Sequence, residues 1–438
     1  MAYSLILGYL AAILSPLIVL SLSSPQTYHS IIYDTGRHFA LTAFAILIMQ
    51  VVLAARLRIV DRNFGLNNVF PFHRNMAILA GSLLLLHPFL LAWGGRKWPL
   101  VTFLDLPWYI WVGRLTFLLL LANAFMSIFR DRIGVKFETW RLGHDISGSL
   151  ILAGAFVHSW YTGGDLADSL PLRVWWLALI ALAVGLFAYH RLVRPQLLRQ
   201  HPYRIMEVTP EAEGVWTLKF APPEGRQRFD FHPGQWQFVT LLRGRGLPEE
   251  EHHFTISSSP AEKDFHTSTI KELGDFTSTI GQTEPGDRAV IHAPFGIFSH
   301  VMRPEVRDLV FIAGGIGITP FMSNLRHMRD TRADKRVLLL YANRREADIA
   351  FRAELAEMEA GAAPDLSVVH VLSRPEGDWQ GEKGRLDQEK LRRLCGRERL
   401  DQAMFYVAGP PGMLEAVISA LQDLKVPDSR VSVEYFAF

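Results

Sequence analysis

The stretch HRNMAILAGSLLLLH, residues 73–87, begins and ends with histidine and is otherwise almost entirely apolar. A second stretch, HDISGSLILAGAFVH at residues 144–158, has the same length and the same terminal histidines. Because 14 residues separate the histidines of each stretch, they lie almost four helical turns apart on nearly one face, roughly 21 Å along the axis. The repeated interval predicts two helices that present imidazole rings at two matching levels.

Both stretches lie in a half of the chain that is dominated by apolar runs. Six runs are close to the length of about 20 mainly apolar residues that a helix needs to cross a bilayer. These runs cover residues 4–22, 38–57, 72–93, 108–129, 144–161 and 172–190. We therefore expect a six-helix transmembrane bundle over residues 1–200. No Lys or Arg precedes Arg37, so the first run is expected to be a retained helix and not a signal peptide.

Basic residues are distributed unevenly over the loops between these runs. Most follow the second, fourth and sixth runs: Arg56, Arg58, Arg62, Arg130, Arg132, Lys136, Arg141, Arg191, Arg194 and Arg199. Because Lys and Arg accumulate in cytoplasmic loops, both termini and the C-terminal half are expected in the cytoplasm.

Overall composition argues against two other classes of protein. The net charge is only +2 and no dense basic stripe is present, which argues against nucleic-acid binding. Cys395 is the only cysteine, so the chain has no disulfide framework, thiolate cluster or C-x-x-C-H motif for covalent haem attachment.

The four histidines at 73, 87, 144 and 158 are candidate ligands of iron. The third and fifth runs cross the membrane in the same direction, which places His73 level with His144 and His87 level with His158. Ionisable groups inside a bilayer are costly and usually functional. Two imidazoles at each level suit six-coordinate haem b, which carries electrons and leaves no open position for a ligand. A zinc site and a proton-conducting chain of histidines are the alternatives.

The C-terminal half is typical of a globular α/β protein with two parts. Residues 203–300 contain five short strand-like segments separated by turns, which predict an antiparallel β-barrel over 201–304. The segments are RIMEV, VWTLKF, QWQFVTLL, HHFTIS and AVIHAPFG. Residues 307–438 alternate strands and helices, which predicts a parallel α/β domain over 305–438.

Two glycine-rich loops in the α/β part follow predicted strands. In AGGIGITP, residues 313–320, the absence of side chains would let a phosphate approach the backbone, and the following helix would offer its free N–H groups. A second loop, VAGPPGM at 407–413, should face the same crevice at the carboxyl ends of the strands. The candidate nucleotide-binding residues are Gly314, Gly315, Gly317, Thr319, Pro320, Gly409 and Pro410.

These two parts together resemble the ferredoxin–NADP reductase superfamily. The flavin motif H-P-[FY]-[ST] corresponds to His252-His253-Phe254-Thr255, in which a histidine replaces proline. The resemblance implies that Thr255 meets the reactive edge of FAD and that His252 and Phe254 bind the cofactor. KELGDFTST, residues 271–279, resembles the pyrophosphate motif, and APFG, residues 293–296, resembles another landmark of the flavin domain. The residues implied in these two motifs are Lys271, Gly274, Thr277 and Gly296.

The same resemblance assigns roles to three further residues. A terminal aromatic residue, here Phe438, would cover the flavin until nicotinamide displaces it. A basic residue after the second strand of the nucleotide domain would meet the 2′-phosphate of NADPH, and Arg344 occupies this place. Arg374 is a weaker candidate for that phosphate, and NADH is the alternative nucleotide.

The whole chain resembles the NADPH oxidase and ferric reductase superfamily, in the compact form of bacterial NADPH oxidases. This resemblance implies electron transfer from cytosolic NADPH through FAD and two haems b across a bacterial inner membrane, with Thr255 and Phe438 at the flavin. Oxygen, reduced to superoxide, is the expected acceptor and a ferric chelate is the alternative. No obligate protein partner is expected. A haem-bearing anchor that only docks a partner is a rival from another class, and intact nucleotide loops argue against it.

Overall fold

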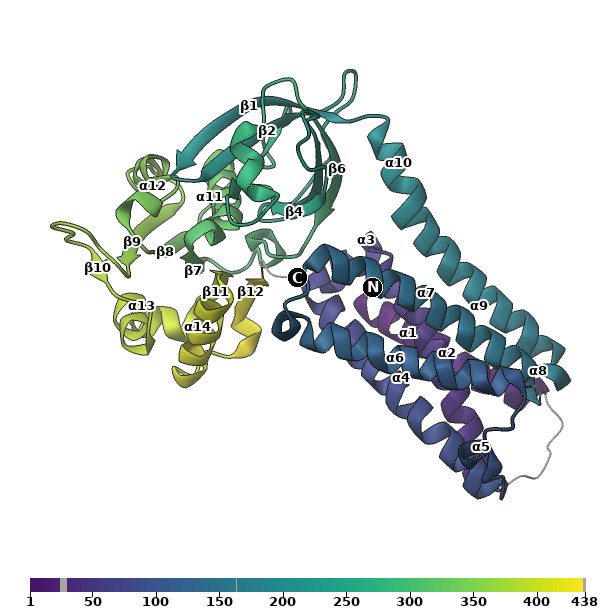
Figure 1. Cartoon of the computed structure of the whole chain (residues 1–438). Helices are drawn as coiled ribbons and strands as arrows, with labels where there is room; N and C mark the ends of the chain where they lie inside the picture. Colours follow the sequence, from purple (N-terminus) through teal and green to yellow (C-terminus); the bar gives the residue numbers. More distant parts are fainter. Residues whose placement is uncertain (24–29, 163, 436–438) are drawn as a thin grey trace. The chain divides into compact units, whose positions relative to one another are not determined.

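The computed structural model describes residues 1–23, 30–162 and 164–435 of the chain (Figure 1). The chain forms two compact units, Met1–Arg194 and Pro195–Phe438. The boundary agrees with the change from apolar runs to alternating strands and helices that the sequence shows near residue 200.

The first unit is entirely helical where it is described, and its long helices run alongside one another (Figure 1). In order, the helices are α1 (Ala2–Ser23), α2 (Ile31–Ala54), α3 (Arg58–Phe64), α4 (Leu66–Gly94), α5 (Pro99–Thr102), α6 (Trp108–Ile133), α7 (Phe137–Tyr161), α8 (Asp165–Asp168) and α9 (Leu170–Ala188). A π-helical turn, Tyr189–Val193, continues α9 into α10 (Arg194–Arg199) at the boundary of the two units.

Five described helices are long and apolar enough to cross a membrane: Ala2–Ser23, Ile31–Ala54, Leu66–Gly94, Trp108–Arg130 and Leu170–Arg199. The remaining predicted span corresponds to α7, which is 25 residues long and carries His144 and His158. It is less apolar than the five because polar residues such as Glu138, Arg141 and Asp145 occupy its first half. The expected helix therefore forms, and its passage through the bilayer stays a prediction.

Helix α2 lies at the centre of the first unit. Its small and branched side chains Ala43, Ala45, Ile46 and Ile48 are completely buried. Outer helices expose large apolar side chains instead, and on α6 Leu115 and Leu118 are each 60% exposed. Exposed apolar surface on this scale requires a lipid environment, so the chain is an integral membrane protein.

The second unit begins with an antiparallel sheet of six strands in the order β4-β3-β6-β1-β2-β5. The strands are β1 (Tyr203–Ala212), β2 (Val215–Ala221), β3 (Trp236–Leu242), β4 (Glu251–Thr255), β5 (His266–Lys271) and β6 (Arg288–Phe295). The five expected strands form, and closure of the sheet into a barrel stays a prediction. Strand β5 is not among the five. Its Thr267, Ser268 and Thr269 are polar residues that do not suggest a buried strand, yet all three are buried.

A second sheet of six strands follows, and all of its neighbouring strands are parallel, as expected. Its strands are β7 (Asp308–Gly314), β8 (Arg336–Asn343), β9 (Asp365–Leu372), β10 (Glu382–Lys383), β11 (Met404–Gly409) and β12 (Val431–Tyr435), in the order β10-β9-β8-β7-β11-β12. The order reverses between β7 and β11, and such a reversal opens a crevice at the carboxyl ends of the two strands.

Helices cover both faces of the parallel sheet (Figure 1). Alternate residues of β7 point to opposite faces, so Phe311 packs with α11 (Thr319–Thr331) and α12 (Arg352–Glu359). Its neighbour Ile312 packs with α13 (Gln388–Gln402) and α14 (Pro411–Asp423) on the other face. The sheet is therefore buried on both sides, which holds the loops at its carboxyl edge in fixed positions.

Candidate functional site

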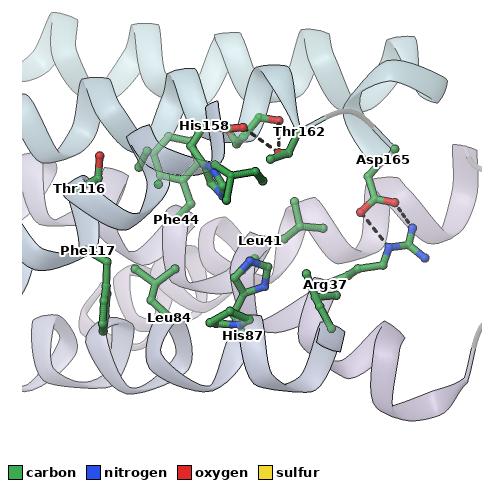
Figure 2. Close-up of a pocket in the computed structure, with 18 of the residues that line it drawn as sticks. Arg37, Leu41, Phe44, Leu84, His87, Thr116, Phe117, His158, Thr162 and Asp165 are labelled. Carbon is green, nitrogen blue, oxygen red and sulfur yellow. Dashed lines mark hydrogen bonds and ion pairs between the residues drawn. The ribbon is translucent and has the colours of Figure 1, made fainter. Parts of the chain in front are cut away.

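A cavity of about 530 Å³ lies inside the helical unit, between α2, α4, α6 and α7 (Figure 2). Its volume falls within the range of about 300–1,000 Å³ found for pockets that hold small molecules and cofactors. His87 on α4 and His158 on α7 both line it, and Figure 2 shows their rings in the space between the two helices. The remaining lining is largely apolar and includes Leu41 and Phe44 of α2.

One nitrogen of each of these histidines is bound to a backbone carbonyl. The Nδ1 atom of His87 lies 3.0 Å from the carbonyl oxygen of Gly36, and Nδ1 of His158 lies 2.8 Å from that of Tyr109. A carbonyl oxygen can only accept a hydrogen bond, so Nδ1 carries the proton in both rings. The other nitrogen, Nε2, then has a lone pair for a metal, as in most metal-binding histidines.

Glycine is required where α6 passes His158. A Cβ atom at Gly113 would lie 2.5 Å from the Nδ1 atom of His158, a distance that atoms cannot adopt. The missing side chain lets the helix approach closely enough for the Tyr109 carbonyl to reach the ring. Gly113 carried no signal in the sequence, because one glycine in an apolar helix has many explanations.

The rings of the second pair of histidines, His73 and His144, lie close to each other. The ring centroids of His73 and His144 are 6.2 Å apart, with 54° between their planes. Two imidazoles on opposite sides of one metal ion, each with nitrogen about 2 Å from it, have centroids roughly 6 Å apart. The Nδ1 atom of His144 lies 3.3 Å from Oγ of Ser127, which itself donates to the carbonyl of Asn123 at 2.8 Å. The separation of His73 and His144 therefore fits the axial ligands of one haem, while the shared cavity and the available Nε2 atoms of His87 and His158 fit those of another.

The polar end of the cavity contains an ion-pair network that the sequence did not reveal. Arg37 donates through Nε to Asp165 at 3.0 Å (Figure 2). It also donates through Nη1 to Asp34 at 2.8 Å. Arg114, which also lines the cavity, donates to the carbonyl of Leu100 at 2.9 Å. The charge of Arg37 is therefore largely neutralised by two carboxylates.

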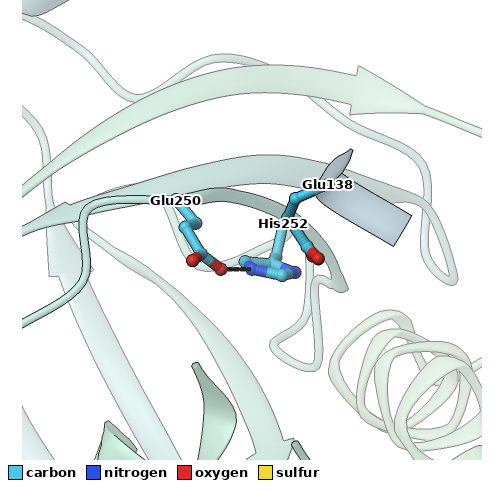
Figure 3. Close-up of side chains that lie close together, drawn as sticks. All are labelled: Glu138, Glu250 and His252. Atoms are coloured by element: carbon cyan, nitrogen blue, oxygen red, sulfur yellow. Dashed lines mark hydrogen bonds and ion pairs between the residues drawn. The ribbon is translucent and has the colours of Figure 1, made fainter. Parts of the chain in front are cut away.

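In the second unit, strand β4 places the flavin-motif residues on its two faces. Phe254 and His252 lie on the same side as Phe276, and the rings of His252 and Phe276 stack with centroids 4.3 Å apart. The Nε2 atom of His252 lies 3.0 Å from a carboxylate oxygen of Glu250 (Figure 3). Thr255 points to the opposite side and is buried.

The predicted pyrophosphate loop follows β5 and is closed by a side chain. Oγ1 of Thr277 accepts hydrogen bonds from the backbone N–H groups of Leu273 and Gly274, each at 2.9 Å. A Cβ atom at Gly274 would meet no atom within 4 Å, so this part of the loop is open. Lys271 is the last residue of β5 and is half-buried.

Gly296 has a structural explanation of its own. Its φ angle is +93°, and a Cβ atom there would lie 2.8 Å from the Trp236 ring. Both observations require glycine without any cofactor.

The glycine-rich loops after β7 and β11 lie on either side of the point where the strand order reverses. A Cβ atom at Gly314 would lie 2.4 Å from Sδ of Met413, and one at Gly317 would lie 2.4 Å from the carbonyl oxygen of Ala408. These two glycines therefore allow the loops to pack together. Among the three glycines of the first loop, Gly315, with φ of +54°, is the one whose Cβ position has no atom within 4 Å.

The remaining nucleotide candidates occupy the edges of these loops. Helix α11 begins at Thr319 with Pro320 in its first turn, as expected. Across the reversal, a Cβ atom at Gly409 would lie 3.1 Å from the Cα atom of Gly314, and Pro410 precedes α14. A 3₁₀ turn, Gly315–Ile318, leads directly into α11, so the N-terminus of the helix lies close to Gly315 at the carboxyl edge of the sheet.

Arg344 and Arg374 are brought together at this same edge. The backbone N–H of Arg374 donates to the carbonyl oxygen of Arg344 at 2.8 Å, and both residues are exposed. Arg345, by contrast, forms ion pairs with Glu213 at 3.0 Å and Asp348 at 3.1 Å. The remaining candidate, Phe438, lies outside the described residues.

Comparisons with known families match both parts of the chain. Residues 39–155 match the family described as ferric reductase like transmembrane component. Residues 311–418 match the oxidoreductase NAD-binding domain. The first match contains three of the four paired histidines and ends shortly before His158, and the second contains both glycine-rich loops.

Individual relatives match about half of this chain. Sulfhydrogenase 1 subunit gamma of Pyrococcus furiosus is 27% identical over 225 residues, which cover 50% of this chain and 74% of the relative. The reductase component of propane 2-monooxygenase from Mycolicibacterium goodii is 26% identical over 239 residues, which cover 53% of this chain and 66% of the relative. The flavohemoprotein of Deinococcus radiodurans is 25% identical, and the match covers 59% of its length. The match thus spans less than two thirds of several relatives.

Among solved structures, a flavohemoglobin from Malassezia yamatoensis with bound FAD and heme is similar at 18% identity. The match covers 93% of this chain and 97% of that chain, with a TM-score of 0.50. At this identity the likeness concerns the fold alone.

Proposed function

We propose, on the premise that this chain has the architecture of the NADPH oxidase and ferric reductase superfamily, that it carries electrons from NADPH across a membrane. The route leads through FAD and two b-type haems to molecular oxygen, which is reduced to superoxide. The dehydrogenase half and both termini face the cytoplasm of a bacterial cell. The proposed domains are a di-haem domain over 1–200, an FAD-binding domain over 201–304 and an NADPH-binding domain over 305–438.

The single observation that carries the proposal is the arrangement of His87 and His158. Both rings line one cavity, and both have Nδ1 bound to a backbone carbonyl, so both offer Nε2. A proton-conducting chain would need rings that exchange protons through both nitrogens, and a carbonyl partner prevents this at Nδ1. A zinc site would need further ligands, and none of the described side chains lining the cavity near the two rings forms such a set.

Each group of residues then has a distinct task. Bound FAD accepts a hydride and releases single electrons, and bound haems carry single electrons. The four histidines hold the haems at two levels, while Lys271, Gly274 and Thr277 hold the flavin phosphates. The N-terminus of α11 and Gly315 bind the nucleotide phosphates, and Arg344 with Arg374 binds the 2′-phosphate.

The balance of charge at the polar end of the cavity favours oxygen over a ferric chelate as the electron acceptor. The charged side chains that line it are Arg37, Arg114, Asp165 and Asp168, two cations and two anions. Ferric chelates of the citrate type are anions and need an excess of positive charge for binding. A balanced lining suits a small neutral acceptor instead.

The test is anaerobic addition of NADPH to the purified protein loaded with FAD, followed by admission of air. The proposal predicts reduction of the haem absorbance by NADPH, then rapid reoxidation in air with formation of superoxide. Slow reoxidation in air with rapid reoxidation by ferric citrate would establish the ferric reductase alternative. Absence of haem reduction by NADPH would refute the electron route itself.

Replacing Arg344 with alanine should change the choice between NADPH and NADH. The loss of one charge-assisted hydrogen bond to phosphate costs about 1.5–3 kcal/mol, so KM for NADPH should rise about tenfold or more. KM for NADH should stay within about twofold, because NADH lacks this phosphate. Arg345→Ala is the matched control, since Arg345 is engaged with Glu213 and Asp348. Equal effects of the two substitutions on NADPH would contradict the assignment.

A further inference from the structure

Helix α11 is attached to the backbone that immediately follows the flavin-motif strand. Oγ of Ser323 donates to the carbonyl oxygen of Ser258 at 2.7 Å, and Nη1 of Arg326 donates to that of Ser257 at 2.8 Å. Ser257 and Ser258 follow Thr255 by two and three residues. The helix that begins at the nucleotide loop is therefore bound to the end of strand β4.

The guanidinium group of Arg326 is held from three sides. Its Nε and Nη2 atoms donate to the two carboxylate oxygens of Glu354 on α12, at 2.8 Å and 2.5 Å. The guanidinium carbon lies over the face of the Phe351 ring, 5.1 Å from the ring centroid. The side chains of Arg326 and Glu354 are only 16% and 25% exposed, so solvent screens the pair weakly. This geometry leaves Arg326 a single orientation, with Nη1 directed at Ser257.

Ser257 is also connected to the antiparallel sheet through its own hydroxyl group. Its Oγ lies 2.9 Å from Oγ1 of Thr267 and 3.0 Å from Oγ1 of Thr269 on β5. Thr269 in turn lies 2.7 Å from Oγ1 of Thr217 on β2. A chain of hydrogen bonds, partly buried at Arg326 and fully buried beyond Ser257, thus leads from α12 into the antiparallel sheet. Buried networks of this kind are rigid when every member has a partner.

We infer that Arg326, assisted by Ser323, is a positioning residue that sets the distance between the nicotinamide and the flavin. The inference rests on the proposed function, because it takes α11 as the nucleotide-binding helix and β4 as the flavin-binding strand. In hydride transfer a C–H bond of the nicotinamide breaks and an N–H bond of the flavin forms. The electron pair moves with the hydrogen, which oxidises the nucleotide and reduces the flavin. The reacting atoms must lie about 3–3.5 Å apart, and a misplacement of about 1 Å costs about 100-fold in rate.

The test replaces Arg326 with lysine, which keeps the positive charge and cannot form the bidentate pair and the Ser257 bond together. The rate of flavin reduction by NADPH, followed anaerobically by stopped flow, should fall about tenfold or more. FAD content and the dissociation constant for NADPH should stay within about twofold. The kinetic isotope effect with NADPH deuterated at the transferred position should increase, which a general loss of stability would not cause.

Arg393→Lys is the matched control for the loss of a bidentate pair. Arg393 on α13 donates to both carboxylate oxygens of Glu382, at 2.8 Å and 2.7 Å, and this pair includes neither Glu354 nor Ser257. Its substitution should leave the rate of flavin reduction within about twofold. Equal rates in Arg326→Lys and wild type would overturn the inference. If Arg326→Lys loses its flavin, the rate of flavin reduction is compared between Ser323→Ala and wild type instead, because that substitution removes only one hydroxyl group. Equal rates would again overturn the inference. A wild-type protein whose flavin NADPH does not reduce would refute the proposed function instead.

Discussion

Replacing His87 with leucine is expected to remove one of two haems and to stop electron flow to the external acceptor. Leucine fills a similar space and offers no ligand atom, while His158 alone provides one axial bond. Loss of a group that merely orients a metal ligand already lowers metal affinity or activity by about 10–100-fold. Loss of the ligand itself should therefore lower the rate of acceptor reduction by at least about 100-fold. The measurement is the haem-to-protein ratio of the purified variant, together with its rate of superoxide formation.

Two further results belong to this prediction. Reduction of bound flavin by NADPH should survive in His87→Leu, because the residues proposed to bind flavin and NADPH lie in the other structural unit. His190→Leu is the matched control, since His190 lies in the π-helical turn of the same unit and belongs to neither pair. Retention of both haems in His87→Leu, or loss of one in His190→Leu, would contradict the ligand assignment.

Replacing Gly317 with alanine is expected to separate the two nucleotide loops and to slow flavin reduction by NADPH. The new methyl group would lie 2.4 Å from the carbonyl oxygen of Ala408, which is backbone and cannot rotate away. Overpacking of this kind costs about 1–3 kcal/mol of folding stability, and the strain is relieved when the two loops move apart. Because a misplacement of about 1 Å at the reacting atoms costs about 100-fold in rate, a shift of the nucleotide by part of that distance should slow NADPH-dependent flavin reduction about tenfold, as measured by stopped flow.

Gly412→Ala provides the comparison for this substitution. Gly412 lies in the neighbouring loop, and its Cβ position has no atom within 4 Å. This variant should reduce its flavin at a rate within about twofold of wild type. Chemical reduction of the haems by dithionite should be unaffected in both variants, because it bypasses the nucleotide. A normal rate in Gly317→Ala would show that the packing of the two loops does not shape the nucleotide site.

Sequence spacing alone predicts the helices of the histidine pairs and the levels at which the rings lie. It could not predict the groups that orient those rings, because the Gly36 carbonyl is 51 residues from His87 and the Tyr109 carbonyl is 49 residues from His158. Contacts over such separations depend on how the helices pack. For the same reason Asp165 gave no signal, since its role depends on the distant Arg37.

The glycine-rich motifs lie at the expected places in the fold, but glycine is needed at their positions for different reasons. Gly314 and Gly317 are needed because the two loops touch, whereas Gly315 is open. A sequence pattern does not distinguish close contact with a ligand from close contact with another loop. Strand β5 could not be predicted because Thr and Ser are typical of surfaces, although here Thr269 is buried and bonds to Thr217 of β2 and to Ser257.

The most direct test of the two histidine pairs is low-temperature electron paramagnetic resonance of the purified ferric protein. Axial ligation by two imidazoles at both levels predicts two low-spin ferric haem signals of comparable intensity and no high-spin signal. A dominant high-spin signal, which requires an open or weakly bound axial position, would contradict the account. So would a preparation with a single low-spin haem or with none.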